Sequence, residues 1–68
     1  MRIIKLINAK PSLLQGEVNH YLKKVQNKYP DKIKIKDIKT CMVADGVEQA
    51  CIIIKVDTSL DPDIALSI

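Results

Sequence analysis

The segment that most constrains the fold is the pair of β-branched runs "KIKIKDIKTCMV" and "VEQACIIIKVD", which flank the short sequence "ADG". Isoleucine and valine favour extended strands. Asp45-Gly46 is typical of a hairpin turn, because glycine adopts a positive φ without strain. We therefore predict a β-hairpin with a three-residue loop, Ala44 to Gly46.

The hydrophobic alternation also predicts the register of this hairpin. It fails at Lys36-Asp37, because Ile33 and Ile35 have odd numbers and Ile38 an even one, so we predict a one-residue bulge there. The loop then sets Ile38 opposite Ile52. The same register sets Thr40 opposite Ala50. Eight residues are predicted to share one face, under a helix: Ile33, Ile35, Ile38, Met42, Ala50, Ile52, Ile54 and Val56.

The first half of the chain predicts a strand and then a helix. "RIIKLI" indicates a strand over residues 2–8. The helix is expected to begin at a capping box formed by Ser12 and Gln15, and Pro11 and Pro30 bracket it. Its apolar residues recur at helical spacing. They are Leu14, Val18, Tyr21, Leu22, Val25 and Tyr29.

These elements predict an α+β fold with the order β-α-β-β. One amphipathic helix packs on a three-stranded, mainly antiparallel sheet, and the first strand lies beside the last. We expect residues 1–56 to form a single domain and residues 57–68 an acidic and apolar C-terminal tail.

The other face of the sheet is also apolar. The same register places five residues on it: Cys41, Val43, Val47, Cys51 and Ile53. One helix covers only one face, and a chain of 68 residues without Trp or Phe has a thin core. We therefore predict a homo-oligomer in which a second copy covers this face; ordinary exposed apolar surface is the alternative.

The tail "TSLDPDIALSI" is ambiguous. Asp61-Pro62 resembles a helix N-cap followed by proline at the first helical position, whereas Ile64, Leu66 and Ile68 alternate as in a strand. We expect the tail to dock on its own subunit or on a neighbour, and we assign Ile64, Leu66 and Ile68 to the oligomer interface. A frayed end is the alternative.

The basic residues point to an anionic partner. The net charge is +3, and residues 57–68 contain acids but no Lys or Arg. The candidate ligand contacts are Arg2, His20, Lys23, Lys24, Lys34 and Lys39. Lysines that protect a strand edge from aggregation are the alternative. We do not expect nucleic-acid binding, because Arg2 is the only arginine and both tyrosines belong to the inner face of the helix.

No motif indicates catalysis or metal binding. His20, the only histidine, is read as solvated on the polar face of the helix beside Glu17 and Lys24, with no catalytic nucleophile or general acid evident within reach. Cys41 and Cys51 face each other nearly opposite across the hairpin and would bond if oxidised, but we read them as small apolar residues. Together with His20 they make a poor zinc set, with three ligands on separate elements. We expect no enzyme activity, no metal and no cofactor.

The chain shows no signal peptide and no apolar run long enough to span a membrane. We therefore expect a cytoplasmic protein without membrane contact.

Two families resemble this chain. The length and the β-α-β-β order look like the dodecins, small proteins that assemble into hollow shells and hold flavin between subunits. That family stacks its flavin on a tryptophan, which this chain lacks. The segments "VNHYL", "IKDIK" and "ACIIIKV" are similar to a family of very small proteins from Gram-positive bacteria and their phages, named for a sporulation-controlled member. That match covers roughly residues 14–56, with Asn19, Tyr21 and Leu22 at the shared helix positions, and it implies a fold and a lineage.

The leading hypothesis is a non-catalytic homo-oligomer that sequesters a small anionic, nucleotide-like ligand between subunits, as a phage-encoded inhibitor of host nucleotide signalling would. The alternative is a protein-binding adaptor, or a spore or phage accessory protein, that uses the exposed sheet face or the tail and holds no ligand. Non-specific nucleic-acid binding is a third hypothesis, and it would show steep salt dependence.

Overall fold

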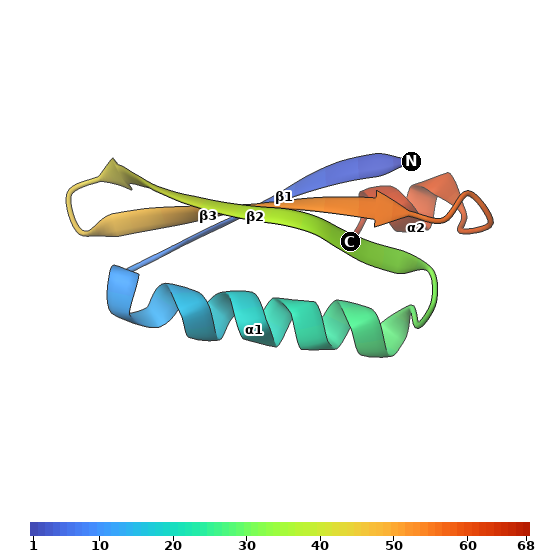
Figure 1. Ribbon diagram of the computed structural model, residues 1–68, viewed down its shortest axis with the longest axis horizontal. Helices are drawn as coiled ribbons and strands as arrows, with labels where there is room; N and C mark the ends of the chain where they lie inside the picture. The colour runs from blue at the N-terminus through green and yellow to red at the C-terminus, as the bar shows by residue number, and fades with distance from the viewer.

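A computed structural model describes all residues, 1–68. The chain forms β1 (Arg2–Ala9), α1 (Pro11–Lys28), β2 (Ile33–Ala44), β3 (Val47–Val56) and a short α2 (Pro62–Leu66). The three strands make one twisted sheet in the order β1-β3-β2, with both pairs antiparallel, and α1 lies along one face of it (Figure 1). The predicted α+β fold and its β-α-β-β order are confirmed.

The predicted hairpin register is also confirmed in its central part. Ile38 pairs with Ile52 and Thr40 with Ala50, and the register shifts between Ile35 and Asp37, which leaves Lys36 as the extra residue. A bulge at this point keeps isoleucines on one face of β2 on both sides of it.

The turn differs from the prediction. A second register shift lies between Met42 and Ala44, and Ala44 pairs with Val47, so Asp45 and Gly46 alone form the loop. Gly46 has a φ of 73°, a conformation that costs glycine little. The predicted three-residue loop is wrong because Val43 is taken up as a second bulge.

Helix α1 begins without the predicted capping box. Its N-cap is Lys10, whose side chain makes no capping hydrogen bond, and Pro11 occupies the first turn. Ser12 therefore lies inside the helix, not at its cap. Proline suits this position because its φ is already helical and it has no N–H to leave unpaired. At the other end the backbone N–H of Tyr29 donates to the Val25 carbonyl at 2.9 Å, and Pro30 follows.

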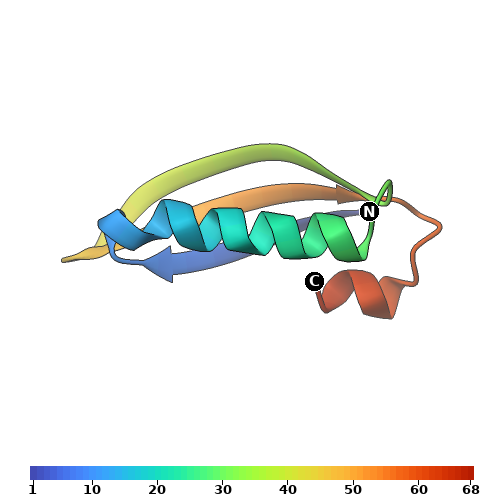
Figure 2. The ribbon, with the colours of Figure 1, turned by 90° about the horizontal axis from the view of Figure 1, so that it is seen from below.

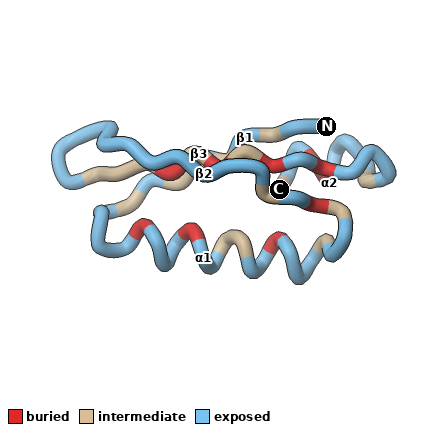
Figure 3. The backbone as a smooth tube through the Cα atoms, in the orientation of Figure 1, coloured by how far each residue is buried: buried red, intermediate tan, exposed pale blue.

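The core lies between α1 and the sheet (Figure 3). Every residue of the predicted helical stripe contributes to it. Leu14, Val18 and Val25 are buried, and Tyr21, Leu22 and Tyr29 are partly buried against them. The largest fully buried side chains are Ile52, Ile54 and Val56 of β3, the strand that has neighbours on both sides.

The prediction that α1 covers the inner face of β2 along its whole length is only partly correct. Helix α1 contacts β1 and β3, and Figure 2 shows the middle of β2 bowing out to one side of it. Ile33 is buried and Ile35 is partly buried, but Ile38 and Met42 are 41% and 57% exposed on the same face. A single helix is too narrow to cover three strands.

The C-terminal tail forms α2 rather than a strand. The Asp61 carboxylate accepts a hydrogen bond from the Asp63 backbone N–H at 2.9 Å, with Pro62 at the first helical position. Ala65 is fully buried, and Leu60 and Ile68 pack against the core. Figure 2 shows α2 beside the C-terminal half of α1, so the tail docks on its own chain.

Both ends of the chain are tied to the same end of the sheet. The N-terminal amino group donates to the Val56 carbonyl at 3.0 Å, and the Lys32 ammonium donates to the Ser59 hydroxyl at 2.6 Å. Neither helix combines the length and the hydropathy needed to cross a bilayer.

Candidate basic site on the open sheet face

The sheet face opposite α1, which we call the open face, carries a row of three cations. Arg2 of β1 pairs with Lys55 of β3, and Lys55 pairs on its other side with Lys34 of β2. Side chains of directly paired residues point to the same side, and like charges in such pairs repel. The side-chain hydrogen bonds at this end of the molecule involve Lys32, Asp57 and Ser59 but none of the three. This basic row is therefore a site of concentrated positive charge, whose three cations make no side-chain hydrogen bond or ion pair within the chain.

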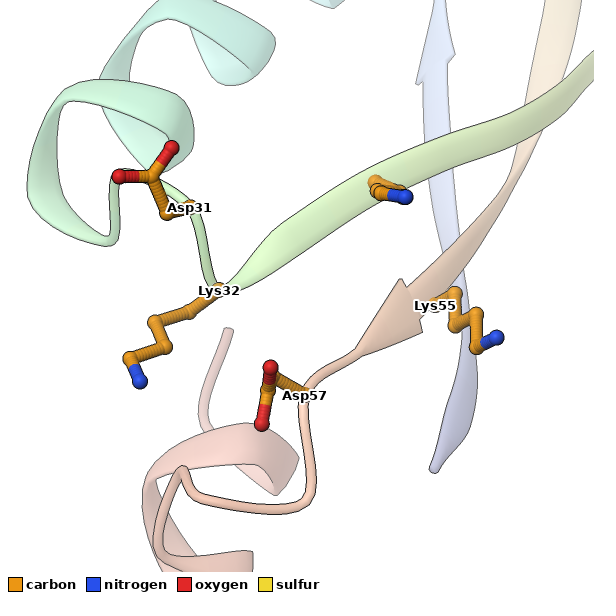
Figure 4. A pocket seen from close by; sticks show the side chains of 5 residues that line it. Asp31, Lys32, Lys55 and Asp57 are labelled. Atoms are coloured by element: carbon orange, nitrogen blue, oxygen red, sulfur yellow. The ribbon is translucent and has the colours of Figure 1, made fainter.

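A small cavity adjoins the basic row. It has a volume of ≈ 160 Å³ and is lined only by charged residues, namely Asp31, Lys32, Lys34, Lys55 and Asp57. Figure 4 shows Asp57 between Lys32 and Lys55, with the Lys55 side chain directed away from Asp57. Asp31 has a φ of 64° where the chain turns from α1 into β2, a conformation that aspartate tolerates better than most residues.

Asp57, which lines the same cavity as Lys34 and Lys55, is held by hydrogen bonds within its own loop. Its carboxylate accepts a hydrogen bond from the Ser59 backbone N–H at 2.8 Å. The hydrogen bonds from Ser59, and then the nearby Lys32 charge, lower the pKa of Asp57. The carboxylate therefore remains ionised well into the acidic range while it holds the loop before α2.

An apolar strip lies next to the basic row on the open face. Ile4 pairs with Ile53, and Leu6 pairs with Cys51. Ile4 and Leu6 are 63% and 54% exposed, whereas Ile53 and Cys51 are half-buried. Since α2 docks on the α1 side, no segment of the chain covers this strip. The open face thus has a basic end followed by an apolar strip on β1 and β3, beside which β2 places Asp37 opposite Ile53 and Lys39 opposite Cys51.

The structure separates the predicted ligand contacts into two groups. Arg2 and Lys34 lie together in the basic row, and Lys39 is on the open face beside Cys51. His20 and Lys23 line a surface hollow on α1, and Lys24 borders another cavity of that helix. The six residues therefore do not form one site within a single chain.

Lys55 is the residue of the basic row that the predicted set omits. Its position opposite Lys34 depends on the Lys36 bulge, and its position opposite Arg2 depends on the β1 register. The pairing of Lys55 with Lys34 could have been predicted from the hairpin pattern. Its pairing with Arg2 requires the observed register between β1 and β3.

The residues predicted for the oligomer interface fall into two groups, one on the sheet and one in the tail. Cys41, Cys51 and Ile53 follow the alternation of the open face, as does Val47 at the start of β3, while Val43 is exposed at the second bulge. The other three lie on or just after α2. Ile68 packs partly against the core, and Ile64 and Leu66 are exposed. The tail residues do not extend the sheet surface because the tail folds back beside α1.

The two cysteines are free, and they are not direct partners. Cys41 pairs with Gln49, whereas Cys51 pairs with Lys39. Diagonal neighbours in an antiparallel pair have Cα atoms about 7–8 Å apart, further than a disulfide usually spans. The two cysteines are therefore diagonal neighbours, nearly opposite as the predicted register has them. No three His, Cys, Asp or Glu side chains are grouped closely enough to hold a metal ion.

A groove lies on the α1 side, where that helix leaves β2 uncovered. It measures ≈ 400 Å³ and includes the exposed Ile38 beside the buried Leu14 and Val18. Its remaining lining residues are Pro11, Gln15, Asn19, Thr40 and Glu48. This surface is less charged than the basic row.

Comparison with protein-family models, with curated proteins and with solved structures finds no match to this chain. The two family resemblances therefore stay predictions.

Proposed function

We propose that this chain is a non-catalytic binding protein that holds a small anionic, nucleotide-like ligand between two copies of itself. The observation that carries the proposal is the basic row, in which Arg2, Lys55 and Lys34 stand directly opposite one another without a carboxylate partner. Repulsion in such a row destabilises the free protein, and a bound phosphate would relieve it.

The surface beside the row supports a ligand of mixed character. A nucleotide combines charged phosphates with a flat, weakly polar base. Phosphates would contact the basic row, and the base would lie over the apolar strip that begins at Ile4 and Ile53. Ligand sites commonly combine apolar contact area with a few directed polar groups.

A second copy is the proposed cover for the open face. In soluble proteins an antiparallel sheet usually has one apolar face and one polar face. Here the covered face has buried isoleucines, and the open face has isoleucines as well, which are partly or largely exposed. If two open faces pack with their basic ends aligned, two basic rows face each other across the interface. An anion between them would neutralise both rows, so ligand binding and self-association would strengthen each other.

The position of the only histidine supports the proposal of sequestration in place of turnover. His20 is exposed on α1, on the other side of the sheet from the basic row. The proposed protein would withdraw its ligand from other receptors, as an inhibitor of host nucleotide signalling encoded by a phage would. Two free thiols fit the reducing cytoplasm, where we place this activity.

Native mass spectrometry combined with titration of ADP and inorganic pyrophosphate tests the proposal. The expected species is an oligomer that retains one of these anions. Lys55→Ala is expected to weaken binding by about tenfold or more, because a charged hydrogen bond is lost. Lys10→Ala is the matched control, since it removes the same charge beyond the far end of β1. A bare monomer that binds neither anion would contradict the proposal.

A protein-binding adaptor is the second candidate, and the groove between α1 and β2 favours it. Ile38 is exposed in this groove, and Met42 is exposed further along β2 on the face that otherwise forms the core. A partner's apolar side chains would complete this part of the core. An oligomer that retains no small molecule and melts at the same temperature with and without ADP would favour the adaptor.

A further inference from the structure

Strand β2 is one edge of the sheet, because the strand order is β1-β3-β2. It pairs with β3 on one side only, so alternate residues direct their backbone N–H and C=O away from the sheet. The Asp57 N–H donates to the Lys32 carbonyl just beyond the ends of these two strands, and this bond sets the alternation. Because β3 has no bulge, the alternation continues past Lys36. In the stretch that follows, the outward backbone groups of β2 belong to Ile38, Thr40 and Met42.

The two edges of the sheet differ in how they are protected. On β1, Lys5 lies on the α1 side, half-buried opposite Ile52. An inward charge on an edge strand discourages pairing with another strand. On the same side, β2 has no charge between its two bulges, where it carries only the exposed Ile38, Thr40 and Met42. Since α1 packs on β1 and β3, the space beside β2 is open to a further strand.

Most outward backbone groups of this stretch have no side-chain partner. The Ile38 N–H donates to the Asp37 carboxylate at 2.8 Å, which closes one end of the stretch. No side chain binds the outward groups of Thr40 and Met42. An added strand would satisfy them with backbone hydrogen bonds, which supply the affinity when a sheet is extended in this way.

We propose that β2 pairs with β2 of a second copy, antiparallel and centred on Thr40, so that two three-stranded sheets join into one. Thr40 then exchanges both backbone hydrogen bonds with its counterpart, and Ile38 of each copy lies opposite Met42 of the other. The two exposed apolar side chains thus cover each other. On the open face, Lys39 lies opposite Cys41 of the other copy, so no like charges are directly opposed.

The bulges of β2 favour this register over its neighbours. The extra residues are Lys36 and Val43, and the strand is regular between them. Centring the pair on Thr40 brings the first bulge of one copy beside the second bulge of the other, so the regular stretches overlap completely. A centre two residues away in either direction would oppose a bulge with regular strand. The chosen register also brings Asp45 of one turn close to Lys36 of the other copy, where opposite charges attract.

This contact is separate from the one proposed for ligand binding. It joins the edges of two sheets and leaves the open face, with its basic row and apolar strip, uncovered. The two contacts can fail independently, because one depends on the β2 backbone and the other on the side chains of the open face.

Disulfide crosslinking with oxidised glutathione tests the register. The background chain carries Cys41→Ser and Cys51→Ser, which remove the native thiols, and Ile4→Ser, which weakens contact through the open face. Thr40→Cys is expected to form a covalent dimer, because Cα atoms of a hydrogen-bonded pair lie about 5.5 Å apart, within disulfide range.

Met42→Cys is the matched control, since it is exposed on the same edge and face. Its two copies would lie four residues apart along the strands, about 14 Å, too far for a disulfide. Met42→Cys alone is therefore expected to stay monomeric on a non-reducing gel. A mixture of Ile38→Cys and Met42→Cys chains is expected to form the mixed dimer.

Two results would overturn the proposal. Thr40→Cys that stays monomeric, while circular dichroism shows a folded chain, would exclude the pairing. Met42→Cys that crosslinks with itself as readily as Thr40→Cys would show random collision or another register. Thr40→Pro gives a test without thiols. It removes an N–H that points out of the sheet, so in the Ile4→Ser chain it is expected to abolish the dimer seen by sedimentation; an undiminished dimer would also contradict the pairing.

Discussion

The two faces of the sheet have similar apolar residues and opposite surroundings. On the α1 side, Ile52 and Ile54 have no exposed surface, whereas Ile4 and Leu6 on the open face keep more than half of theirs. The covered face carries the packing that stabilises the monomer, because buried apolar area is the main favourable term in folding. The open face contributes little to that core, and next to its isoleucines it carries a row of cations. This contrast in exposure is the basis of the proposal that the covered face serves folding and the open face serves binding.

The largest expected effect is a loss of folding stability when the core on the covered face is disrupted. Ile52→Ala should lower the free energy of unfolding by about 2–5 kcal/mol, because it leaves a cavity in a core that has few other large residues. Urea denaturation followed by circular dichroism measures the loss. In a domain this small, such a loss is a large fraction of the whole stability. A change of only a few tenths of a kcal/mol would mean that Ile52 is not packed as described.

A smaller effect is expected on the open face, and it should depend on protein concentration. Ile4→Ser removes apolar surface worth roughly 1.5–3 kcal/mol if a second copy covers it, and almost nothing if it faces water. The melting temperature of the unmodified chain should rise with concentration more steeply than that of Ile4→Ser. Leu13→Ser is the control, because Leu13 is 57% exposed but lies on α1. Equal behaviour of the two variants would remove the distinction between the faces.

The smallest expected effects come from substituting the two glycines, which tests the stability of the monomer apart from its self-association. Gly16→Ala should stabilise the chain by about 1 kcal/mol, because glycine is costly inside a helix and an added Cβ meets no atom within 4 Å. Gly46→Ala should do the opposite, by about 1–2 kcal/mol, because its φ of 73° strains any residue with a Cβ. Both are measured by thermal unfolding. A destabilising Gly16→Ala would show that something packs against the first turns of α1, for example a neighbouring copy.

Much of the fold could be predicted from the sequence, because local patterns determine it. The stripe from Leu14 to Tyr29 determines the inner face of α1, and the change from odd to even isoleucines around Lys36 predicts the bulge. The tail could not be decided in this way. Asp61-Pro62 and the alternation of Ile64, Leu66 and Ile68 favour different structures, and the burial of Ala65 against the core selects the helix.

The candidate sites were harder to predict than the fold. The basic row unites three strands, so its full membership depends on two registers: the hairpin pattern places Lys34 opposite Lys55, but only the pairing of β1 adds Arg2. The cavity that Lys24 borders between α1 and the end of the chain depends on where the tail docks, which no local pattern in the sequence reveals. Side-chain groups assembled from distant segments need the tertiary structure.

Sedimentation equilibrium of the purified chain, with and without pyrophosphate, tests most directly whether the open face is an interface between copies. The account predicts a mass that is a multiple of 7.6 kDa at high concentration, and a shift toward the larger species when the anion is added. A single 7.6 kDa particle at every concentration, unchanged by pyrophosphate, would contradict it.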